Sequence, residues 1–226
     1  MLSASGLRKS FGRRLALSGV GFEVGRGERL SVIGPNGAGK TTLLSILAGT
    51  LRADGGTVAG AARSFGWVPQ RAAVYRRLTV AENLRLFARL EGVADVAGAV
   101  ERMLELATLD ERRDDRVEAL SGGNQQRLNI ALGLVGDPDV LLLDEPSAAL
   151  DPRQRQRLWH FVGGLSEHGT TVVFSTHNVS EAERYGDRLL VLADGELLYD
   201  GTPGGLRGAG ADFEQSFVEF LREHGH

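Results

Sequence analysis

A glycine-rich loop sets the strongest limit on how this chain folds, and it reads Gly34-Pro35-Asn36-Gly37-Ala38-Gly39-Lys40-Thr41-Thr42. It fits the pattern G-x-x-x-x-G-K-[ST], in which backbone N–H groups surround phosphate oxygens. The glycines permit backbone conformations and close approaches that a Cβ would block. Lys40 can reach terminal phosphates, and the Thr41 hydroxyl can ligate Mg²⁺. The loop therefore predicts a nucleotide-binding protein.

The flanks of the loop agree with this interpretation. Arg29–Ile33 reads as a short apolar strand that runs into the loop, and Thr42–Ala48 as a helix whose positive N-terminal end faces the phosphates. Lysine is rare in this chain, since Lys9 and Lys40 are the only two, so the composition disfavours a chance match.

Composition bounds the remaining possibilities. A length of 226 residues allows one domain, or one domain with a subdomain. The net charge of −3 gives no reason to expect nucleic-acid binding. The absence of cysteine excludes disulfides, thiolate metal sites and cysteine nucleophiles. No apolar run approaches the roughly 20 residues that span a bilayer, so we expect any membrane role to come through a partner.

The apolar patterns predict an α/β fold with a mostly parallel sheet, an N-terminal antiparallel β subdomain and a helical insert. The expected strands are residues 2–7, 15–24, 29–33, 65–68, 140–143 and 170–175, followed by a hairpin of 188–193 and 196–199 around an Asp-Gly turn. The expected helices are residues 42–48, 81–90, 96–106, 122–134 and 152–167. Thr79 and Glu82 form a capping-box pattern, and Asp151 is the expected cap before Pro152.

Two carboxylates end the most apolar strand. Val140–Leu143 reads as a central strand buried on both faces, and Asp144 and Glu145 follow it. At the carboxyl end of such a strand Asp144 can hold the Mg²⁺ shell, and Glu145 can take a proton from an attacking water. The structural alternative is a pair of hydrogen-bonded loop residues, which the presence of a phosphate loop in the same chain disfavours.

Three single residues carry open alternatives. Gln70 follows a predicted strand and is either an ordinary surface residue or a ligand through Mg²⁺ or water. His177 follows the strand 170–175 and could hydrogen-bond a γ-phosphate, although a lone histidine is more often structural. Phe11 could stack on a purine ring, but its position on a polar turn favours a half-buried packing role.

The sequence Leu120-Ser121-Gly122-Gly123-Asn124-Gln125 opens the helix that ends near Leu134. Ser121 is a good N-cap, and the glycines leave the helix end bare. The segment is either an ordinary helix cap or a second anion site, in which exposed N–H groups and the helix dipole face a phosphate.

In their order along the chain, these motifs resemble the nucleotide-binding domain of ATP-binding cassette (ABC) transporters, most of all bacterial exporter-type cassettes. The matching positions are Gly34–Thr42 as Walker A, Gln70 as the Q-loop, Leu120–Gln125 as the signature, Val140–Glu145 as Walker B, Ser147–Asp151 as the D-loop and His177 as the switch histidine. The Leu-Ser-Gly-Gly-[NQ]-Gln pattern discriminates best, because other phosphate-loop proteins lack it. The resemblance covers nearly the whole chain.

The resemblance implies one ABC ATPase domain over residues 1–226, with a core of 1–75 and 137–226 and a helical subdomain of 76–136 that carries the signature. The cofactors would be ATP and Mg²⁺, with Thr41, Gln70 and Asp144 near the metal, partly through water. The catalytic residues would be Glu145, His177 and Lys40. Phe11 falls at the aromatic position that stacks on adenine, which reverses the packing interpretation, although tyrosine is commoner there.

The resemblance also implies partners. A second cassette would pack head to tail, so that Ser121, Gly122, Gly123 and Gln125 act in trans, with Asp151 of the D-loop near the interface. A separate integral membrane permease would contact the region around Ala72–Thr79 and hold the chain at the cytoplasmic face of the membrane. We therefore expect an ATPase subunit of a transporter, more similar to exporters. The alternatives are a soluble ABC ATPase of DNA repair or translation, and an importer subunit.

Overall fold

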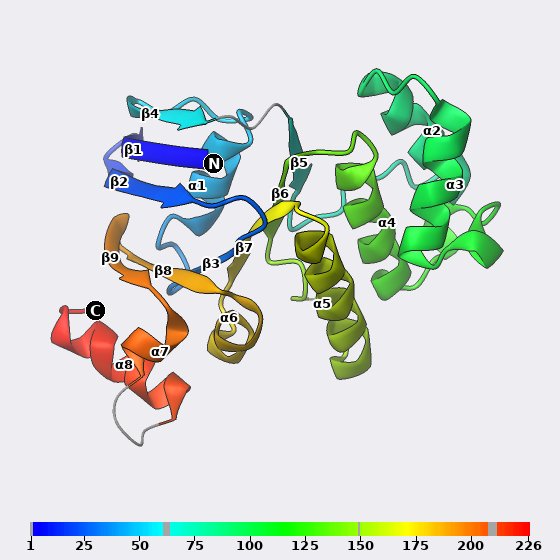
Figure 1. The fold of residues 1–226 in the computed structure, drawn as a ribbon. Helices are drawn as coiled ribbons and strands as arrows, with labels where there is room; N and C mark the ends of the chain where they lie inside the picture. Colours follow the sequence, from blue (N-terminus) through cyan, green and yellow to red (C-terminus); the bar gives the residue numbers. More distant parts are fainter. Residues whose placement is uncertain (1, 61–63, 149, 208–211) are drawn as a thin grey trace.

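The structure is a computed structural model that describes residues 2–60, 64–148, 150–207 and 212–226. Two sheets and a helical region make up the molecule, as Figure 1 shows. The mostly parallel sheet, the N-terminal antiparallel sheet and the helical insert confirm the fold class expected from the sequence.

The central sheet has the strand order β5-β6-β7-β3-β8-β9. Its strands are Phe65–Val68 (β5), Val140–Asp144 (β6), Thr171–Thr176 (β7), Arg29–Ile33 (β3), Arg188–Ala193 (β8) and Glu196–Gly201 (β9). The pairs from β5 to β8 are parallel, and only the β8–β9 hairpin is antiparallel. Every residue of β6 and β7 is buried, as a strand covered on both faces requires.

The parallel order determines where the candidate site lies. The segments that follow β3, β5, β6 and β7 leave the sheet at the same edge, because parallel strands end together. In the register of the sheet, Asp144 lies opposite Ser175, and Ile33 lies opposite Thr176. The glycine-rich loop, the carboxylates and the histidine therefore meet at this edge.

The second sheet, of order β2-β1-β4, is antiparallel. It consists of Leu2–Phe11 (β1), Arg14–Val24 (β2) and Gly55–Gly60 (β4). The strand β1 reaches Phe11, so the expectation of a polar turn over residues 8–14 was wrong in extent. Helix α1, Lys40–Leu47, packs in one apolar core with both sheets.

A helical region with its own apolar core lies on the side of β5 and β6 opposite to α1 in Figure 1. It contains Val80–Leu90 (α2), Val96–Ala107 (α3), two short 3-10 turns at Asp110–Arg112 and Val117–Ala119, and Gly122–Leu134 (α4). The capping box predicted at α2 is present, with the Thr79 hydroxyl accepting from the N–H of Glu82 and the Glu82 carboxylate accepting from the N–H of Thr79. These helices and turns extend from Val80 to Leu134, which is inside the predicted range 76–136.

The remaining helices are Pro152–Glu167 (α5), Val179–Tyr185 (α6), Pro203–Leu206 (α7) and Phe213–Glu223 (α8). Asp151 caps α5 as predicted, with its carboxylate accepting from the N–H of Gln154 at 2.9 Å. The short helix α6 follows β7 directly and packs on β3 and β7. Its residue Glu181 accepts hydrogen bonds from Ser147 and Thr176, which lie next to the candidate site.

Candidate active site

The glycines of the loop adopt backbone conformations that other residues rarely take. Gly37 and Gly39 have φ angles of 87° and 106°. A Cβ on Gly34 would overlap the carbonyl oxygen of Leu192, and a Cβ on Gly39 would overlap that of Ala16. The loop is thus a cradle that tolerates only glycine at these positions, as the sequence predicted.

Lys40 begins α1 and is almost fully buried, with 6% of its surface exposed. Its Nζ donates to the carbonyl oxygens of Gly34 and Pro35 at 2.8 and 3.2 Å, and lies 3.9 Å from Glu145 Oε1. Burial lowers the pKa of Lys40 from its ordinary value, while the charges of Glu145 and Asp144 oppose that shift. The loop's own carbonyls therefore hold the ammonium group inside the cradle.

Asp144 joins the loop to the end of β6. The Thr41 hydroxyl donates to its carboxylate at 3.0 Å, and the Ser175 hydroxyl donates to Oδ1 at 2.6 Å. Asp144 and Ser175 are both buried. A carboxylate beside a threonine hydroxyl at a phosphate loop is the oxygen set expected around Mg²⁺. The prediction from the sequence had no role for Ser175, although a serine within the apolar strand 170–175 was a visible signal.

Glu145 and His177 form a pair. His177 Nδ1 lies 2.7 Å from Glu145 Oε2, and the histidine side chain is 59% exposed whereas the glutamate is 9% exposed. The backbone of Glu145 has a φ of 49°, an uncommon conformation for a residue with a side chain. Its N–H is held by the carbonyl and hydroxyl oxygens of Ser175 at 3.2 and 3.0 Å. The fold thus holds Glu145 with a strained backbone, and its buried carboxylate contacts the exposed imidazole of His177.

A pocket of about 370 Å³ brings the predicted binding residues together. Its lining comprises Phe11, Arg14, Ala16, Asn36, Gly37, Gly39, Lys40, Thr41, Thr42, Gln70 and Glu145. Phe11 is 51% exposed, and the Lys9 ammonium lies 5.6 Å from the centroid of its ring. Arg14 donates to the carbonyl of Gly37 at 3.0 Å, a contact that no sequence motif predicted.

The signature segment lies elsewhere. Ser121, Gly122, Gly123 and Gln125 are at or near the start of α4, and none of them lines the pocket of the glycine-rich loop. The Ser121 hydroxyl accepts from the N–H of Asn124 at 3.4 Å, so the N-cap prediction is confirmed. Ser121 and Gly122 are exposed. A Cβ on Gly122 would meet no atom of the described residues within 4 Å, so none of these residues requires a glycine there.

The D-loop connects the two regions. Ser147 is buried just after Glu145, and Asp151 is exposed at the start of α5. Position 149 of the predicted D-loop lies outside the described residues. The side chain of Gln154, one turn into α5, packs where a Cβ on Gly123 would stand, so the start of α5 lies against the start of α4.

The site fits a nucleoside triphosphate with Mg²⁺. The cradle excludes Cβ atoms from the space that phosphate oxygens would approach, and the first turn of α1 has no side-chain cap on its N–H groups. Thr41 and Asp144 would hold the ion together with water and phosphate, since Mg²⁺ commonly keeps waters and binds one or two carboxylates together with phosphates.

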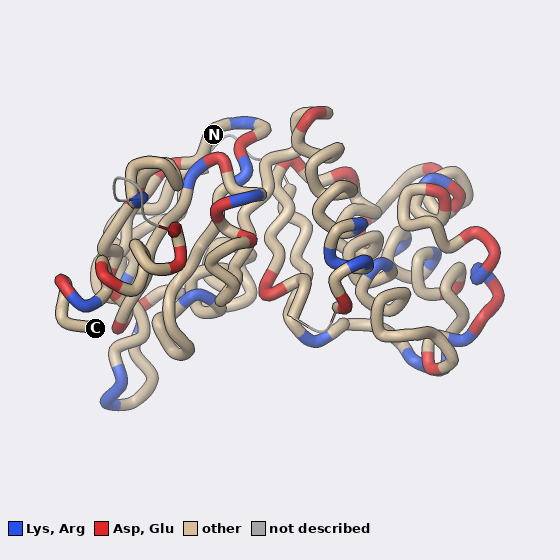
Figure 2. Tube along the Cα trace, turned by 90° about the horizontal axis from the view of Figure 1, so that it is seen from below, with Lys and Arg blue, Asp and Glu red and all other residues tan. Residues whose placement is uncertain are grey.

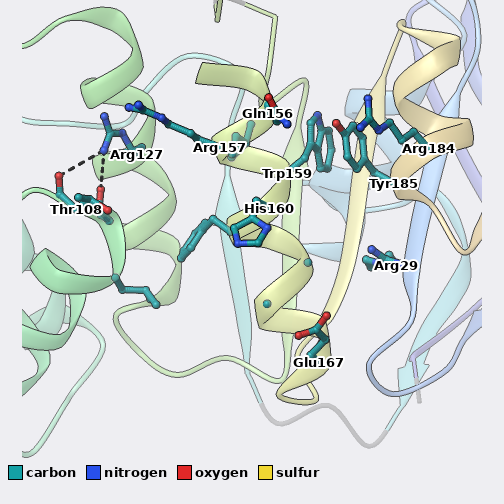
Figure 3. Close-up of a pocket in the computed structure, with 16 residues that line it drawn as sticks. Arg29, Thr108, Arg127, Gln156, Arg157, Trp159, His160, Glu167, Arg184 and Tyr185 are labelled. Carbon is teal, nitrogen blue, oxygen red and sulfur yellow. Dashed lines mark hydrogen bonds between the residues drawn. The ribbon is translucent and has the colours of Figure 1, made fainter. Parts of the chain in front are cut away.

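A larger hollow, of about 1,020 Å³, runs along α5 (Figure 3). It is lined by side chains such as Arg127, Arg157, Trp159, Arg184 and Tyr185, and it shares no residue with the pocket around the glycine-rich loop. Size alone does not identify the chemical site here, because the smaller pocket holds the phosphate cradle and the carboxylate.

Comparison with known proteins shows which family these sequence motifs match. The family model described as ABC transporter matches residues 17–148. The chain is 40% identical over 216 residues to the Nod factor export ATP-binding protein I of Ralstonia nicotianae, covering 90% of this chain and 67% of that protein. It is 34% identical over 215 residues to the linearmycin resistance ATP-binding protein LnrL of Bacillus subtilis, covering 89% and 69%.

Solved structures agree with the sequence matches. The structure of an ATP binding subunit of an ABC transporter has a TM-score of 0.85 at 28% identity and covers 98% of this chain and 99% of that one. An ATP-binding cassette in a dimeric, post-hydrolysis state bound to ADP and Pi has a TM-score of 0.81 at 28% identity, with coverages of 92% and 100%.

Proposed function

The chain belongs to the ABC transporter family, whose cassettes bind and hydrolyse ATP with Mg²⁺, and we propose that it is the ATPase subunit of a membrane exporter. The observation that carries the proposal is the single pocket where the phosphate cradle, Lys40 and Glu145 meet. The named relatives act in Nod factor export and linearmycin resistance, and this supports export over import.

Each residue of the site has a proposed role. The loop N–H groups and Lys40 hold the phosphates, and Phe11 stacks on the base. Thr41, Gln70 and Asp144 surround the Mg²⁺, which neutralises phosphate charge when bound. Glu145 accepts a proton from the attacking water, because its carboxylate is held at the pocket wall beside the Lys40 ammonium.

His177 has a proposed role at the γ-phosphate. It stands exposed above Glu145, so its ring can bond to a phosphate oxygen while Nδ1 keeps its contact with the carboxylate. This arrangement orients both groups toward the same reacting atoms. Nδ1 must donate to Glu145 and Nε2 must donate to the phosphate oxygen, so this arrangement requires a proton on both ring nitrogens.

Ser121, Gly122 and Gly123 are proposed to complete the site of a second copy, packed head to tail, with Asp151 close to that interface. Gln125 supports them from behind, since its amide donates to the carbonyls of Leu120 and Val117 at 3.0 and 3.2 Å. The support for trans action is the exposed Gly122, at a position where no atom of the described residues requires a glycine.

Substitution of the proposed base tests the chemistry. Glu145→Gln keeps the shape of the side chain but cannot accept a proton, so ATP binding should persist while turnover falls by about two or more orders of magnitude. Phosphate release and nucleotide titration measure the two effects separately. Unchanged turnover would show that another group acts as the base.

The permease is proposed to contact the surface around Ala72–Thr79. This segment is anchored from behind, because the N–H groups of Ala73 and Tyr75 donate to the side-chain oxygens of Asn129 and Asn83 at 3.1 and 2.8 Å. The Tyr75 ring is 55% exposed and packs on Phe87, which gives an aromatic docking point. The segment is thus a firm loop between Gln70 and the helical region.

We propose a peripheral position at the cytoplasmic face of the membrane, through a separate permease subunit. No helix among the described residues has the length and apolar character to cross a bilayer. Figure 2 shows basic and acidic residues intermixed along the described trace, and this supports a protein partner rather than nucleic acid. Co-purification with an integral membrane protein is the expected result, whereas stable binding to ribosomes or DNA would favour the soluble alternative.

A further inference from the structure

Glu181 is a buried carboxylate that none of the roles above uses. It lies in the first turn of α6 and has only 4% of its surface exposed. Burying a carboxylate is costly unless hydrogen bonds and a cation satisfy it. The groups that satisfy Glu181 come from three separate segments of the chain, and all three belong to or adjoin the candidate site.

The first two partners stand beside the proposed catalytic groups. The Ser147 hydroxyl lies 2.8 and 2.7 Å from the two carboxylate oxygens of Glu181, and Ser147 is two residues beyond Glu145. The Thr176 hydroxyl donates to Oε2 at 3.0 Å, and Thr176 directly precedes His177. Both hydroxyl-bearing residues are buried. One carboxylate therefore ties the chain after Glu145 to the chain before His177.

The third partner belongs to α5. Arg155 Nε lies 3.1 Å from Glu181 Oε1, and the same guanidinium donates to the carbonyl of Leu150 in the D-loop at 3.4 Å. The D-loop is the segment that we place near the second copy. Arg155 Nε makes no hydrogen bond among the described residues, so its contact with Glu181 is an ion pair. Any displacement of Leu150 or of the start of α5 therefore reaches the carboxylate through this ion pair.

The proposed catalytic pair depends on such support. Glu145 and His177 meet through one 2.7 Å contact, and the Glu145 backbone is in a strained conformation that must be held by its surroundings. The imidazole is exposed, so packing alone does not fix it. The Ser147 and Thr176 bonds to Glu181 fix the backbone on both sides of this contact.

We propose that Glu181 is a positioning residue that holds His177 against Glu145 and transmits the placement of the D-loop to that pair. This inference rests on the proposed ATPase function. It assigns Glu181 no contact with the substrate. In the assembled dimer, the partner copy would act on hydrolysis through the D-loop, Arg155 and Glu181.

The test compares Glu181→Gln with Glu183→Gln, a matched change two residues along the same helix. Glu183 forms its ion pair with Arg207 at the surface and contacts no group of the site, so its variant should retain wild-type turnover. Glu181→Gln should lower kcat by about 10- to 100-fold, the scale of misplaced catalytic groups, and leave the KM for ATP within about twofold.

A double-variant cycle separates positioning from general damage. If Glu181 acts through His177, adding Glu181→Gln to His177→Ala should cost little further turnover, because the group to be positioned is already absent. Multiplied losses, an unchanged kcat in Glu181→Gln, or a rise in KM alone would each overturn the proposal.

Two smaller changes keep the inference testable if the Glu181→Gln variant does not fold. Ser147→Ala and Thr176→Val each remove one hydroxyl from the carboxylate, and each should lower kcat in the same direction without a change in KM. If Glu181→Gln fails to fold, these variants decide the question, and wild-type kcat in both contradicts the inference. Glu145→Gln in the same assay keeps the proposals distinct, since its loss of turnover supports the ATPase chemistry whatever Glu181 does.

Discussion

Phe11 illustrates what a single residue contributes and how its setting changes its meaning. Its position in the sequence favoured a packing role, and only the family resemblance reversed that interpretation. In the structure it ends β1, is 51% exposed, and shares a pocket with Lys40 and Gln70. An exposed aromatic ring beside a phosphate cradle suits a purine ring, because stacking needs no hydrogen-bonding edge.

Truncation of this ring should weaken nucleotide binding without changing the chemistry. Phe11→Ala should raise the Kd for ATP about tenfold, since a base–aromatic stack contributes roughly 1–3 kcal/mol. Phe11→Tyr should retain wild-type affinity. Titration with a fluorescent ATP analogue measures the effect. Leu15→Ala is the matched control, because Leu15 is 48% exposed on the neighbouring strand and does not line the pocket. Equal losses in both variants would count against stacking.

Residues that follow a local rule were predictable from sequence, whereas residues that act through tertiary contacts were not. The cradle glycines and the cap at Ser121 belong to local patterns. Glu181 was not predicted, because its partners Ser147 and Arg155 are distant in sequence and meet it only in the fold. The contact of Arg14 with Gly37 was not predicted for the same reason, because it joins β2 to the loop that follows β3.

At the scale of elements, α5 connects the proposed interface to the core. It begins at the D-loop, where Asp151 caps it, and its inner face is fixed by Trp159. The indole packs on Phe174 of β7 at a centroid distance of 4.5 Å. It stacks on Tyr185 at 4.9 Å, as Figure 3 shows. Its Nε1 is buried and has no hydrogen-bond partner among the described residues.

Removal of this anchor should destabilise the chain strongly. Trp159→Ala should lower the free energy of unfolding by about 3–5 kcal/mol, because it leaves a large cavity between α5 and the sheet. Trp159→Phe should cost much less, since it keeps an aromatic ring and removes the unpaired N–H. Denaturant unfolding followed by circular dichroism measures both. His160→Ala, exposed on the same helix, should remain within about 0.5 kcal/mol of wild type. A smaller loss for Ala than for Phe would contradict this assignment.

Long elements with a clear period were predicted within a few residues, but short or exposed elements were missed. The helices α2, α3 and α5 and the buried strand β6 match their apolar patterns. The strand β4 was not predicted, because five of its six residues are exposed and its pairing with β1 alone defines it. The helix α6 has only 7 residues, too few for a period to show.

At the scale of the whole molecule, the phosphate cradle and the signature occupy separate regions. They lie at the start of α1 and the start of α4, on either side of β5 and β6 in Figure 1. The sequence could place each motif on its element, but it could not place the two relative to one another. That arrangement depends on the order of strands in the central sheet.

Mixing two inactive variants tests whether the site is shared between copies. Lys40→Ala damages the cradle, and Gly122→Asp places a negative charge at the signature without a clash inside the chain. Each variant alone should be inactive. A dimer of one of each holds one damaged site and one intact site, so the mixture should regain ATP turnover. Lys40→Ala mixed with Lys40→Ala, Glu145→Gln is the control that should stay inactive. No recovery in the first mixture would indicate a site contained in one chain.

The open position of Gly122 also bears on how the molecule responds to its surroundings. If ATP bridges two copies, nucleotide binding and self-association are linked equilibria, and each strengthens the other by the same factor. Dilution of the protein then weakens its apparent affinity for ATP. Anchoring two copies to one membrane complex raises their effective concentration without adding a contact between them. A subunit held beside its twin therefore responds to ATP concentrations that leave a dispersed subunit unbound.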